Sequence, residues 1–303
     1  MKHNLPFFSI IIPTYTRPKQ LASCLQAVAQ LDYAKEHFEV IVVDDGSPEP
    51  PHSLVASFDE RVDIKLISQP NAGPATARNR GGAHAKGEFL AFTDDDCAPE
   101  AGWLQALANG LAAQPDHLVG GQVVNALEEN LFSTATQLLL SYLYSRYNHP
   151  PEQATFFTTN NFALPTAGFK ELGGFETTFR TGEDREFCDR WLHHGYRMTY
   201  VPEAVVYHAH ALSLTRFCRQ HFNYGRGTFN FRRLRAQRQR EPIKVERLSF
   251  YLNLLRYPFS QTTARHALLL LGLFLLSQVA NTLGFFWEMQ TGAVRHQEGE
   301  WGK

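Results

Sequence analysis

The stretch that decides the fold is FSIIIPTYTRPKQLASCLQAVAQLDYAKEHFEVIVVDDGS, residues 8–47. It begins and ends with continuous apolar runs of Ile, Val and Phe, which are typical of strands buried on both faces of a sheet. Between the two runs, residues 18–31 have a helix-like pattern of apolar side chains. A strand, a helix and a second strand in this order predict a right-handed βαβ unit with parallel strands.

The same alternation continues along the chain and defines the fold class. Up to about residue 126 we expect further strands and helices at 62–69, 74–87, 88–94, 101–114 and 117–126. A mixed region follows, with helices expected at 131–147 and 183–195 and strands at 156–165 and 196–210. The pattern predicts an α/β protein with a mostly parallel sheet flanked by helices.

The composition predicts a globular chain with a C-terminal appendage. Of the 303 residues 44% are hydrophobic and 19% charged, which is typical of a chain with a sizeable core. From about residue 211 the sequence becomes basic and then apolar, so we expect a domain over residues 1–210 and a helical extension over 211–303. The four cysteines show no CxxC spacing, and the N-terminal run FFSIIIP is too short for a signal peptide, so we expect a cytoplasmic protein.

Four polar or Gly/Pro-rich motifs fall where the predicted strands end. They are PTYTR at 13–17, DDGS at 44–47, NAGPATARN at 71–79 and TDDD at 93–96. The carboxyl ends of parallel strands meet at one edge of a sheet, and ligands bind outside that edge. The convergence of the four motifs predicts a ligand site more sharply than any one of them does alone.

An apolar run ends in Thr93, and three consecutive carboxylates come directly after it: Asp94, Asp95 and Asp96. Adjacent like charges repel, so we expect a positive group among them. Mg²⁺ and Mn²⁺ prefer oxygen ligands, and in an extended segment Asp94 and Asp96 would point to one side, toward an ion, and Asp95 to the other. A diphosphate beside the ion would supply the missing ligands. The alternative is an Asp-rich turn that caps the helix beginning near residue 101.

The other motifs at this edge are weak signals one by one. Asp44 and Asp45 precede a glycine turn, where carboxylates can accept hydrogen bonds from a base and a ribose. Gly73 marks a loop-to-helix boundary whose N–H groups suit an anion, and Arg78 on the first turns of that helix could reach a phosphate. For each segment, an ordinary surface turn is the alternative.

Two downstream motifs complete the candidate residues. Glu183 and Asp184 begin a predicted helix, either as caps favoured by the helix dipole or as a general base that deprotonates a hydroxyl nucleophile. The sequence does not choose between these two carboxylates. His208 and His210 lie on one side of a strand ending, where a neutral imidazole could complete the coordination of Mn²⁺, although a core or surface histidine is the commoner case.

Together these motifs resemble the inverting glycosyltransferases of family 2, which have the GT-A nucleotide-diphospho-sugar transferase fold. The matching segments stand in the family's order and cover about residues 8–210: SIIIPTYTR, EVIVVDDGS, NAGPATARN, FLAFTDDD, TTNNFALP, GGFE, GEDREFCDRW and VPEAVVYH. The resemblance implies a Rossmann-like catalytic domain over residues 1–210. It also implies transfer of a sugar, expected to be a hexose, from a nucleotide diphosphate, most often UDP, to a hydroxyl of a glycan or lipid-linked acceptor.

The resemblance also implies which residues bind the nucleotide sugar. Those of the nucleoside pocket would be Pro13, Tyr15, Arg17, Asp44 and Asp45. Those near the diphosphate and the sugar would be Gly73, Arg78, Asp94, Asp95, Asn160 and Asn161, with the two asparagines placed where the donor sugar or the acceptor is contacted.

The metal and the chemistry follow from the same resemblance. TDDD matches the metal-binding DxD motif, so Mn²⁺ or Mg²⁺ would be held by Asp94, Asp96 and the downstream His208. Asp184 matches the catalytic base, with Glu183 as the second candidate. The mechanism implied is a single displacement, in which the deprotonated acceptor attacks the anomeric carbon opposite the nucleotide and inverts its configuration.

The sequence departs from the family pattern at two points, and two other functions compete with this one. Members often have a single metal-binding Asp in the triplet, and PTYNR is common where this sequence has PTYTR. A sugar nucleotidyltransferase would be expected to have a Gly-rich basic loop after the first strand, which PTYTRPKQ lacks. A non-catalytic nucleotide-sugar-binding subunit of a polysaccharide assembly complex is disfavoured by the intact DDD, ED and His motifs.

The C-terminal third predicts contact with a membrane surface. Residues 267–287 are long enough to span roughly 30 Å of hydrocarbon. One helical face would nevertheless carry a polar stripe, which suits an interfacial helix or a helix pair: Ser277, Gln278, Asn281 and Thr282. Five arginines between residues 232 and 240 could attract anionic headgroups or a lipid-linked phosphate.

We therefore expect peripheral association with the inner face of the cell membrane and a role in envelope polysaccharide synthesis. The alternative is a helix that packs on the catalytic domain or on a second subunit, as in an oligomer. Nucleic-acid binding is not expected, because the basic tract lacks interleaved aromatic residues and a base-reading motif.

Overall fold

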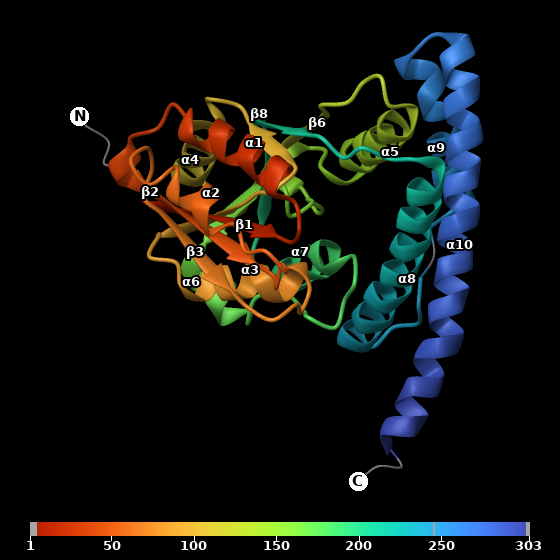
Figure 1. The fold of residues 1–303 in the computed structure, drawn as a ribbon. Coiled ribbons are helices and arrows are strands. Elements are labelled where there is room, and N and C mark those ends of the chain that lie inside the picture. Colours follow the sequence, from red (N-terminus) through yellow and green to blue (C-terminus); the bar gives the residue numbers. More distant parts are fainter. Residues whose placement is uncertain (1–4, 245, 301–303) are drawn as a thin grey trace. The chain divides into compact units, whose positions relative to one another are not determined.

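The computed structural model describes residues 5–244 and 246–300 (Figure 1). By its internal contacts the chain divides into two compact units. The first unit comprises Met1–Ala126, Tyr144–Thr177 and Phe187–His210, and the second comprises Leu127–Leu143, Thr178–Glu186 and Ala211–Lys303. Two segments from before residue 210 thus share a unit with the C-terminal helices. The two-domain division expected at residue 210 stays a prediction.

An eight-stranded sheet forms the frame of the first unit, in the strand order β3-β2-β1-β4-β7-β6-β8-β5. The strands are β1 (Phe8–Thr14), β2 (Phe38–Asp44), β3 (Ile64–Ser68), β4 (Phe89–Phe92), β5 (Cys97–Pro99), β6 (Leu118–Asn125), β7 (Phe162–Pro165) and β8 (Met198–His208). The first four are parallel neighbours, β6 and β8 are parallel to each other, and β5 and β7 run antiparallel to their neighbours. The predicted α/β class and mostly parallel sheet are confirmed.

The order of the strands explains where a ligand site can form. From β1 the chain proceeds outward through β2 to β3, and it then returns to place β4 on the other side of β1. The direction of winding therefore reverses between β1 and β4. In open α/β sheets this reversal leaves a crevice beyond the carboxyl ends of the strands, where ligands bind.

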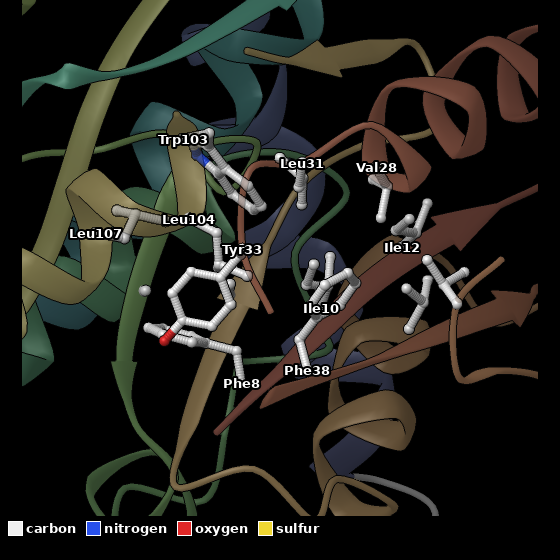
Figure 2. Close-up of a cluster of buried hydrophobic side chains, with 14 of the residues drawn as sticks. Phe8, Ile10, Ile12, Val28, Leu31, Tyr33, Phe38, Trp103, Leu104 and Leu107 are labelled. Carbon is white, nitrogen blue, oxygen red and sulfur yellow. The ribbon is translucent and has the colours of Figure 1, made fainter. Parts of the chain in front are cut away.

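The core of the first unit lies where helices cover the apolar strands. The helices and short 3-10 turns of this unit are α1 (Pro18–Ala29), η1 (Lys35–His37), α2 (His52–Ala56), α3 (Pro74–Ala83), α4 (Trp103–Ala113), η2 (Pro151–Gln153) and α6 (Thr166–Glu171). Every residue of β1 and β2 is buried, as their continuous apolar runs predict. Figure 2 shows part of this core, in which side chains of α1, of the loop after it and of α4 lie among those of the strands: Phe8, Ile10, Ile12, Val28, Leu31, Tyr33, Phe38, Trp103, Leu104 and Leu107.

The second unit is helical. It contains α8 (Leu214–Gln239), α9 (Leu248–Gln261) and α10 (Ala264–Glu300), together with parts of α5 (Leu131–Tyr147) and α7 (Glu183–His193). Its core joins α5 to the three C-terminal helices through Ala135, Leu139, Tyr142, Phe217, Leu254, Leu270 and Phe274.

The stretch Ala264–Thr291 of α10 is long and apolar enough to cross a membrane, judged by length and composition. The four residues of the polar stripe predicted on this helix are buried to different extents. Ser277 is buried, Gln278 and Asn281 are half-buried, and Thr282 is exposed.

Candidate active site

Positive groups do lie among the three aspartates, as predicted. Nη1 of Arg17 is 3.2 Å from Oδ1 of Asp95 and 2.9 Å from Oδ2 of Asp96. Nη2 of the buried Arg78, on α3, is 2.6 Å from Oδ1 of Asp94. Thr14, at the end of β1, donates a hydrogen bond of 2.7 Å to Oδ2 of Asp95. The segment after β4 is thus tied to β1 at the point where the winding of the sheet reverses.

The orientation predicted for the three aspartates is wrong. The prediction assumed an extended segment, with Asp94 and Asp96 on one side and Asp95 on the other. Residues 95 and 96 instead form a turn, so Asp95 and Asp96 both reach Arg17 while Asp94 pairs with Arg78. The turn leads directly into the short strand β5, which the sequence pattern did not predict.

Asp95 and Asp96 differ in acidity although they share Arg17. Burial raises the pKa of Asp95 to about 6, and the hydrogen bond from Thr14 and the charge of Arg17 only partly oppose that effect. Burial would also raise the pKa of Asp96. The hydrogen bond and charge of His208, with the charges of Arg17 and His210, outweigh it and lower the pKa of Asp96 to about 2. Asp96 is therefore ionised at every physiological pH.

Asp96 and His208 are brought together by the pairing of β5 with β8. Cys97 is the register partner of His208, and the N–H of Ala209 donates a hydrogen bond of 2.9 Å to the carbonyl of Asp96. As a result, Nε2 of His208 lies 3.3 Å from Oδ1 of Asp96. The ring of His210 stacks on that of His208 with a centroid separation of 4.2 Å.

The donor atoms at this point fit a divalent cation. Ligand atoms of Asp96, Cys97 and His208 lie within 4.8 Å of one another. A carboxylate and an imidazole suit Mn²⁺, whereas a thiol is a softer ligand that Mn²⁺ does not prefer. Burial and the charges of Asp94 and Asp96 raise the pKa of the Cys97 thiol. The structure thus brings together two of the three predicted metal ligands, and a metal contact of Asp94 stays a prediction.

Asp44 and Asp45 end β2 side by side but have different surroundings. Oδ1 of Asp45 accepts hydrogen bonds from Nε2 of Gln69 and the N–H of Ala72, and Oδ2 accepts one from the N–H of Gly73, all between 2.7 and 2.9 Å. Asp45 therefore fastens the loop after β3. Oδ2 of the fully buried Asp44 has no hydrogen-bond partner among the residues that the structure describes.

The loops after β1 and β2 are also linked to each other. The N–H of Thr16 donates a hydrogen bond of 2.8 Å to the hydroxyl of Ser47. In the loop after β2, Gly46 has φ +81°, and a Cβ there would lie 2.6 Å from the N of Asn71. Only glycine fits such a turn. Of the predicted pocket residues nearby, Tyr15 is exposed and Pro13 is buried within β1.

The two asparagines at 160 and 161 have separate roles. Asn161 is fully buried and its amide is engaged inside the protein: Oδ1 accepts from Nε1 of Trp103, and Nδ2 donates to the carbonyls of Gln122 and Ala204, each at 2.8 Å. These bonds make Asn161 a structural link between α4, β6 and β8. Asn160, whose Oδ1 accepts a hydrogen bond from Thr158, keeps its predicted ligand contact as a prediction.

Glu183 and Asp184 begin α7, as predicted, and belong to the second unit. Oδ1 of Asp184 accepts a hydrogen bond of 2.7 Å from the N–H of Arg185. One turn further, the buried Glu186 pairs with Arg238 of α8. This ion pair joins the first turns of α7 to α8. The role of Asp184 or Glu183 as a general base stays a prediction.

The sequence reasoning did not name three residues of the site. Thr14 binds Asp95, Ser47 links two loops, and Gln69 binds Asp45. Thr14 and Ser47 stand inside the strand-end motifs PTYTR and DDGS, and Gln69 directly follows β3, so their place at strand ends was the available signal. Their partners lie on other strands, which a sequence motif does not reveal.

Comparison with known proteins shows the family of the chain. The sequence profile described as Glycosyl transferase family 2 matches residues 9–173, which is more than half of the chain. The chain belongs to this family. It is a nucleotide-sugar glycosyltransferase, and the matched range includes all four strand-end motifs. The predicted resemblance is confirmed, and membership sets aside the sugar nucleotidyltransferase and the non-catalytic subunit.

Two curated relatives illustrate the range of the family. The glycosyltransferase is 28% identical over 229 residues to Glycosyltransferase AglE of Haloferax volcanii, covering 75% of this chain and 74% of AglE. It is 31% identical over 193 residues to the Pre-mycofactocin glycosyltransferase of Mycobacterium tuberculosis. That match covers 61% of this chain but only 40% of the relative. Neither relationship fixes the donor or the acceptor.

A solved structure supports the fold. The mannosyltransferase PcManGT from Pyrobaculum calidifontis, in complex with GDP-Man and Mn²⁺, superposes with a TM-score of 0.64 at 18% sequence identity. The match covers 91% of this glycosyltransferase and 87% of PcManGT. The predicted GT-A fold is confirmed.

Proposed function

We propose that this glycosyltransferase is a metal-dependent inverting enzyme that transfers a hexose from a UDP-sugar to a hydroxyl of a glycan or of a lipid-linked acceptor. The observation that carries the proposal is the position of Asp96 beyond the carboxyl end of β4, with Oδ1 3.3 Å from Nε2 of His208 and Oδ2 2.9 Å from Nη1 of Arg17. A carboxylate and an imidazole at a phosphate-binding edge suit a cation that accompanies a diphosphate. The proposal includes a location at the inner face of the cell membrane and a role in envelope polysaccharide synthesis.

Different residues of this edge would bind the base, the diphosphate and the metal ion. Asp44 offers a buried carboxylate oxygen that can accept a hydrogen bond from the N–H of a base, which relieves the cost of leaving that oxygen unpaired. Arg78, fixed on α3, would lie near the diphosphate. Mn²⁺ or Mg²⁺, held by Asp96 and His208 with Asp94 as the third predicted ligand, would supply positive charge that stabilises the departing nucleoside diphosphate.

Asp184 is the proposed general base. At the first turn of α7 its carboxylate would take the proton of the acceptor hydroxyl, so that the oxygen can attack the anomeric carbon from the face opposite the nucleotide. Glu183 is the second candidate. Because one displacement inverts the anomeric centre, the product would have the opposite configuration to the donor.

A thermal-shift panel of UDP, GDP and dTDP, each with and without Mn²⁺, tests the donor and metal together. The preferred nucleotide should stabilise the protein only with Mn²⁺, by about 2.7 kcal/mol at a hundredfold excess over its dissociation constant. Asp96→Asn and His208→Ala should remove this metal-dependent gain. His194→Ala, which alters an exposed histidine, is the matched control.

Three results would contradict the proposal, on the metal, on the donor nucleotide and on the stereochemistry respectively. Equal stabilisation with and without Mn²⁺ would exclude metal-dependent binding. A larger shift with GDP or dTDP would exclude UDP as the donor nucleotide. Retention of anomeric configuration in the product, measured by NMR, would exclude the single displacement.

A further inference from the structure

From residue 277 onward, helix α10 has a small and polar face toward its own unit, whereas Ala267, Leu270 and Phe274 before it are packed inward. Between residues 277 and 291 the buried positions are Ser277, Ala280, Gly284 and Glu288. The exposed positions follow helical spacing on the opposite side and are between 48% and 61% exposed: Leu268, Leu275, Val279, Leu283 and Phe286. A helix of a protein surrounded by water normally has these two faces the other way round.

The inner face is built for close contact with α8. A Cβ on Gly284 would lie 1.9 Å from the carbonyl O of Phe222, and a Cβ on Gly225 would lie 1.9 Å from that of Asn281. The two backbones therefore meet through glycine on both helices. Arg226 and Asn230 of α8 also bind the buried Glu288, with Arg226 Nε 2.6 Å from Oε2. Small residues and polar links at a helix contact are typical of helices whose outer faces lie in lipid.

The outer face is long, and Gly272 and Thr282 are the exposed non-apolar positions along it between Leu268 and Phe286. From Leu268 to Phe286 it extends over about 27 Å at 1.5 Å per residue. Within Ala264–Thr291, only 22% of the apolar 18-residue stretch that is long enough to span a membrane is buried in the protein. Trp287, which is 55% exposed, adds an aromatic ring of the kind enriched at the boundary between hydrocarbon and water.

The contact with α8 argues against a helix that crosses the membrane. Crossing would take α8 into the hydrocarbon beside α10. The arginines of α8 are Arg216, Arg219, Arg226, Arg232, Arg233, Arg235 and Arg238. Each arginine at the bilayer centre is strongly unfavourable. An orientation in the plane of the membrane lets the arginines stay at the level of the headgroups while the leucines of α10 enter the acyl boundary.

Charge decides between a lipid surface and a second copy of the chain. Residues 211–291 contain twelve lysines and arginines but three glutamates and no aspartate, a net charge of +9. Several of these cations are exposed, including Arg219, Arg256 and Arg265. Two copies that met through this face would bring like charges together, whereas an anionic bilayer would attract them.

We propose that the outer face of α10 docks on an anionic lipid surface, with the helix lying in the plane of the membrane and not crossing it. This docking surface consists of Leu268, Leu275, Val279, Leu283 and Phe286, with arginines of the same unit binding headgroup phosphates. The surface belongs to the second unit and shares no residue with the proposed nucleotide site. It holds the enzyme at the membrane whatever the identity of the sugar.

Flotation of the full chain with vesicles tests this inference. We expect binding to phosphatidylcholine vesicles that contain phosphatidylglycerol and much weaker binding to phosphatidylcholine alone. A triple variant, Leu275→Gln/Val279→Gln/Leu283→Gln, keeps the net charge and should lower the partition coefficient at least about 100-fold. The matched control, with Met at the same three positions, keeps the apolar surface and should bind like the unaltered chain. Circular dichroism of all three proteins should show the same helical content.

The opposing results separate the alternatives. Equal flotation of the Gln and Met variants, or no flotation of the unaltered chain, would overturn the docking surface. A chain that stays in membranes after an alkaline carbonate wash would show a spanning helix and overturn the in-plane orientation. A chain that does not float but is a dimer by light scattering, with a monomeric Gln variant, would show that a second copy covers this face.

Discussion

Replacing Asp95 by Asn should stabilise the ligand-free protein at neutral pH, although it removes a residue of the proposed site. Burial raises the pKa of Asp95 from 3.8 to about 6, so the folded protein holds this proton more tightly than the unfolded chain does. Stability therefore falls as the pH rises from 3.8 to 6, and the loss is complete above pH 6. A shift of about two units corresponds to about 3 kcal/mol.

The pKa of about 6 already includes the ion pair with Arg17 and the hydrogen bond from Thr14, so losing the pair is not a separate cost. The amide oxygen of the substituted side chain can accept the hydrogen bond from Thr14, which leaves the amide NH2 facing Nη1 of Arg17. Because the side chain of Arg17 is 51% exposed, this contact between two donors should cost about 0–1 kcal/mol. We therefore expect a net gain of about 2–3 kcal/mol at pH 7.5, or about 3–5 °C in Tm for a chain of this length.

Thermal and urea unfolding of Asp95→Asn and the unaltered chain at pH 4 and pH 7.5, without metal, measure this gain. Asp59→Asn alters an exposed aspartate and is the matched control, with no change expected at either pH. The gain for Asp95→Asn should be confined to the higher pH. A variant less stable than the unaltered chain at pH 7.5, or a gain of equal size at both values, would refute the reasoning from burial.

Three further predictions concern the second unit. Burial lowers the pKa of His221 to about 4, so the folded protein is most stable with the ring neutral, above pH 6.5. Between pH 6.5 and pH 4 the free energy of unfolding should fall by up to about 3 kcal/mol. In His221→Phe, urea titrations should show a smaller fall over the same pH range. Gly284→Ala should lower the free energy of unfolding by about 3 kcal/mol because its Cβ meets the backbone of Phe222, whereas Gly272→Ala, with open space around it, should be neutral or gain up to about 1 kcal/mol. Asp184→Asn should lower the transfer rate by about 10²–10⁴ with nucleotide affinity nearly unchanged, and lost affinity with retained turnover would remove Asp184 from the role of base.

The sequence predicted the sheet and its functional edge well because both depend on local patterns. Continuous apolar runs and the motifs that follow them are visible in short windows, and the order of strands and helices fixes where those motifs meet. The pairing of Asp94 with Arg78 is also within reach of such reasoning, since each residue lies at a predicted strand end or helix start.

The contacts that the sequence did not predict depend on pairing over long distances. The bridge between Asp96 and His208 needs β5, a strand of three residues that includes a proline, to pair with β8 about a hundred residues later. The turn at Asp95 and Asp96 reversed the side-chain directions expected from an extended segment. Asn161 matches a ligand-contact motif, but its amide is used up by Trp103 and two carbonyl groups, which no local pattern shows.

The hydrogen bonds of Asp45 have a consequence for how mutations of this region should be interpreted. One carboxylate secures Gln69, Ala72 and Gly73, so hydrogen bonds within the protein itself order the segment that leads into α3. Donor binding should then require little further loss of chain entropy. A change at Asp45 would release that segment and weaken donor affinity even if no atom of the donor touches the side chain. A lower donor affinity in a variant of Asp45 would therefore show that the segment from Gln69 to Gly73 must be rigid. It would not by itself show that Asp45 contacts the donor.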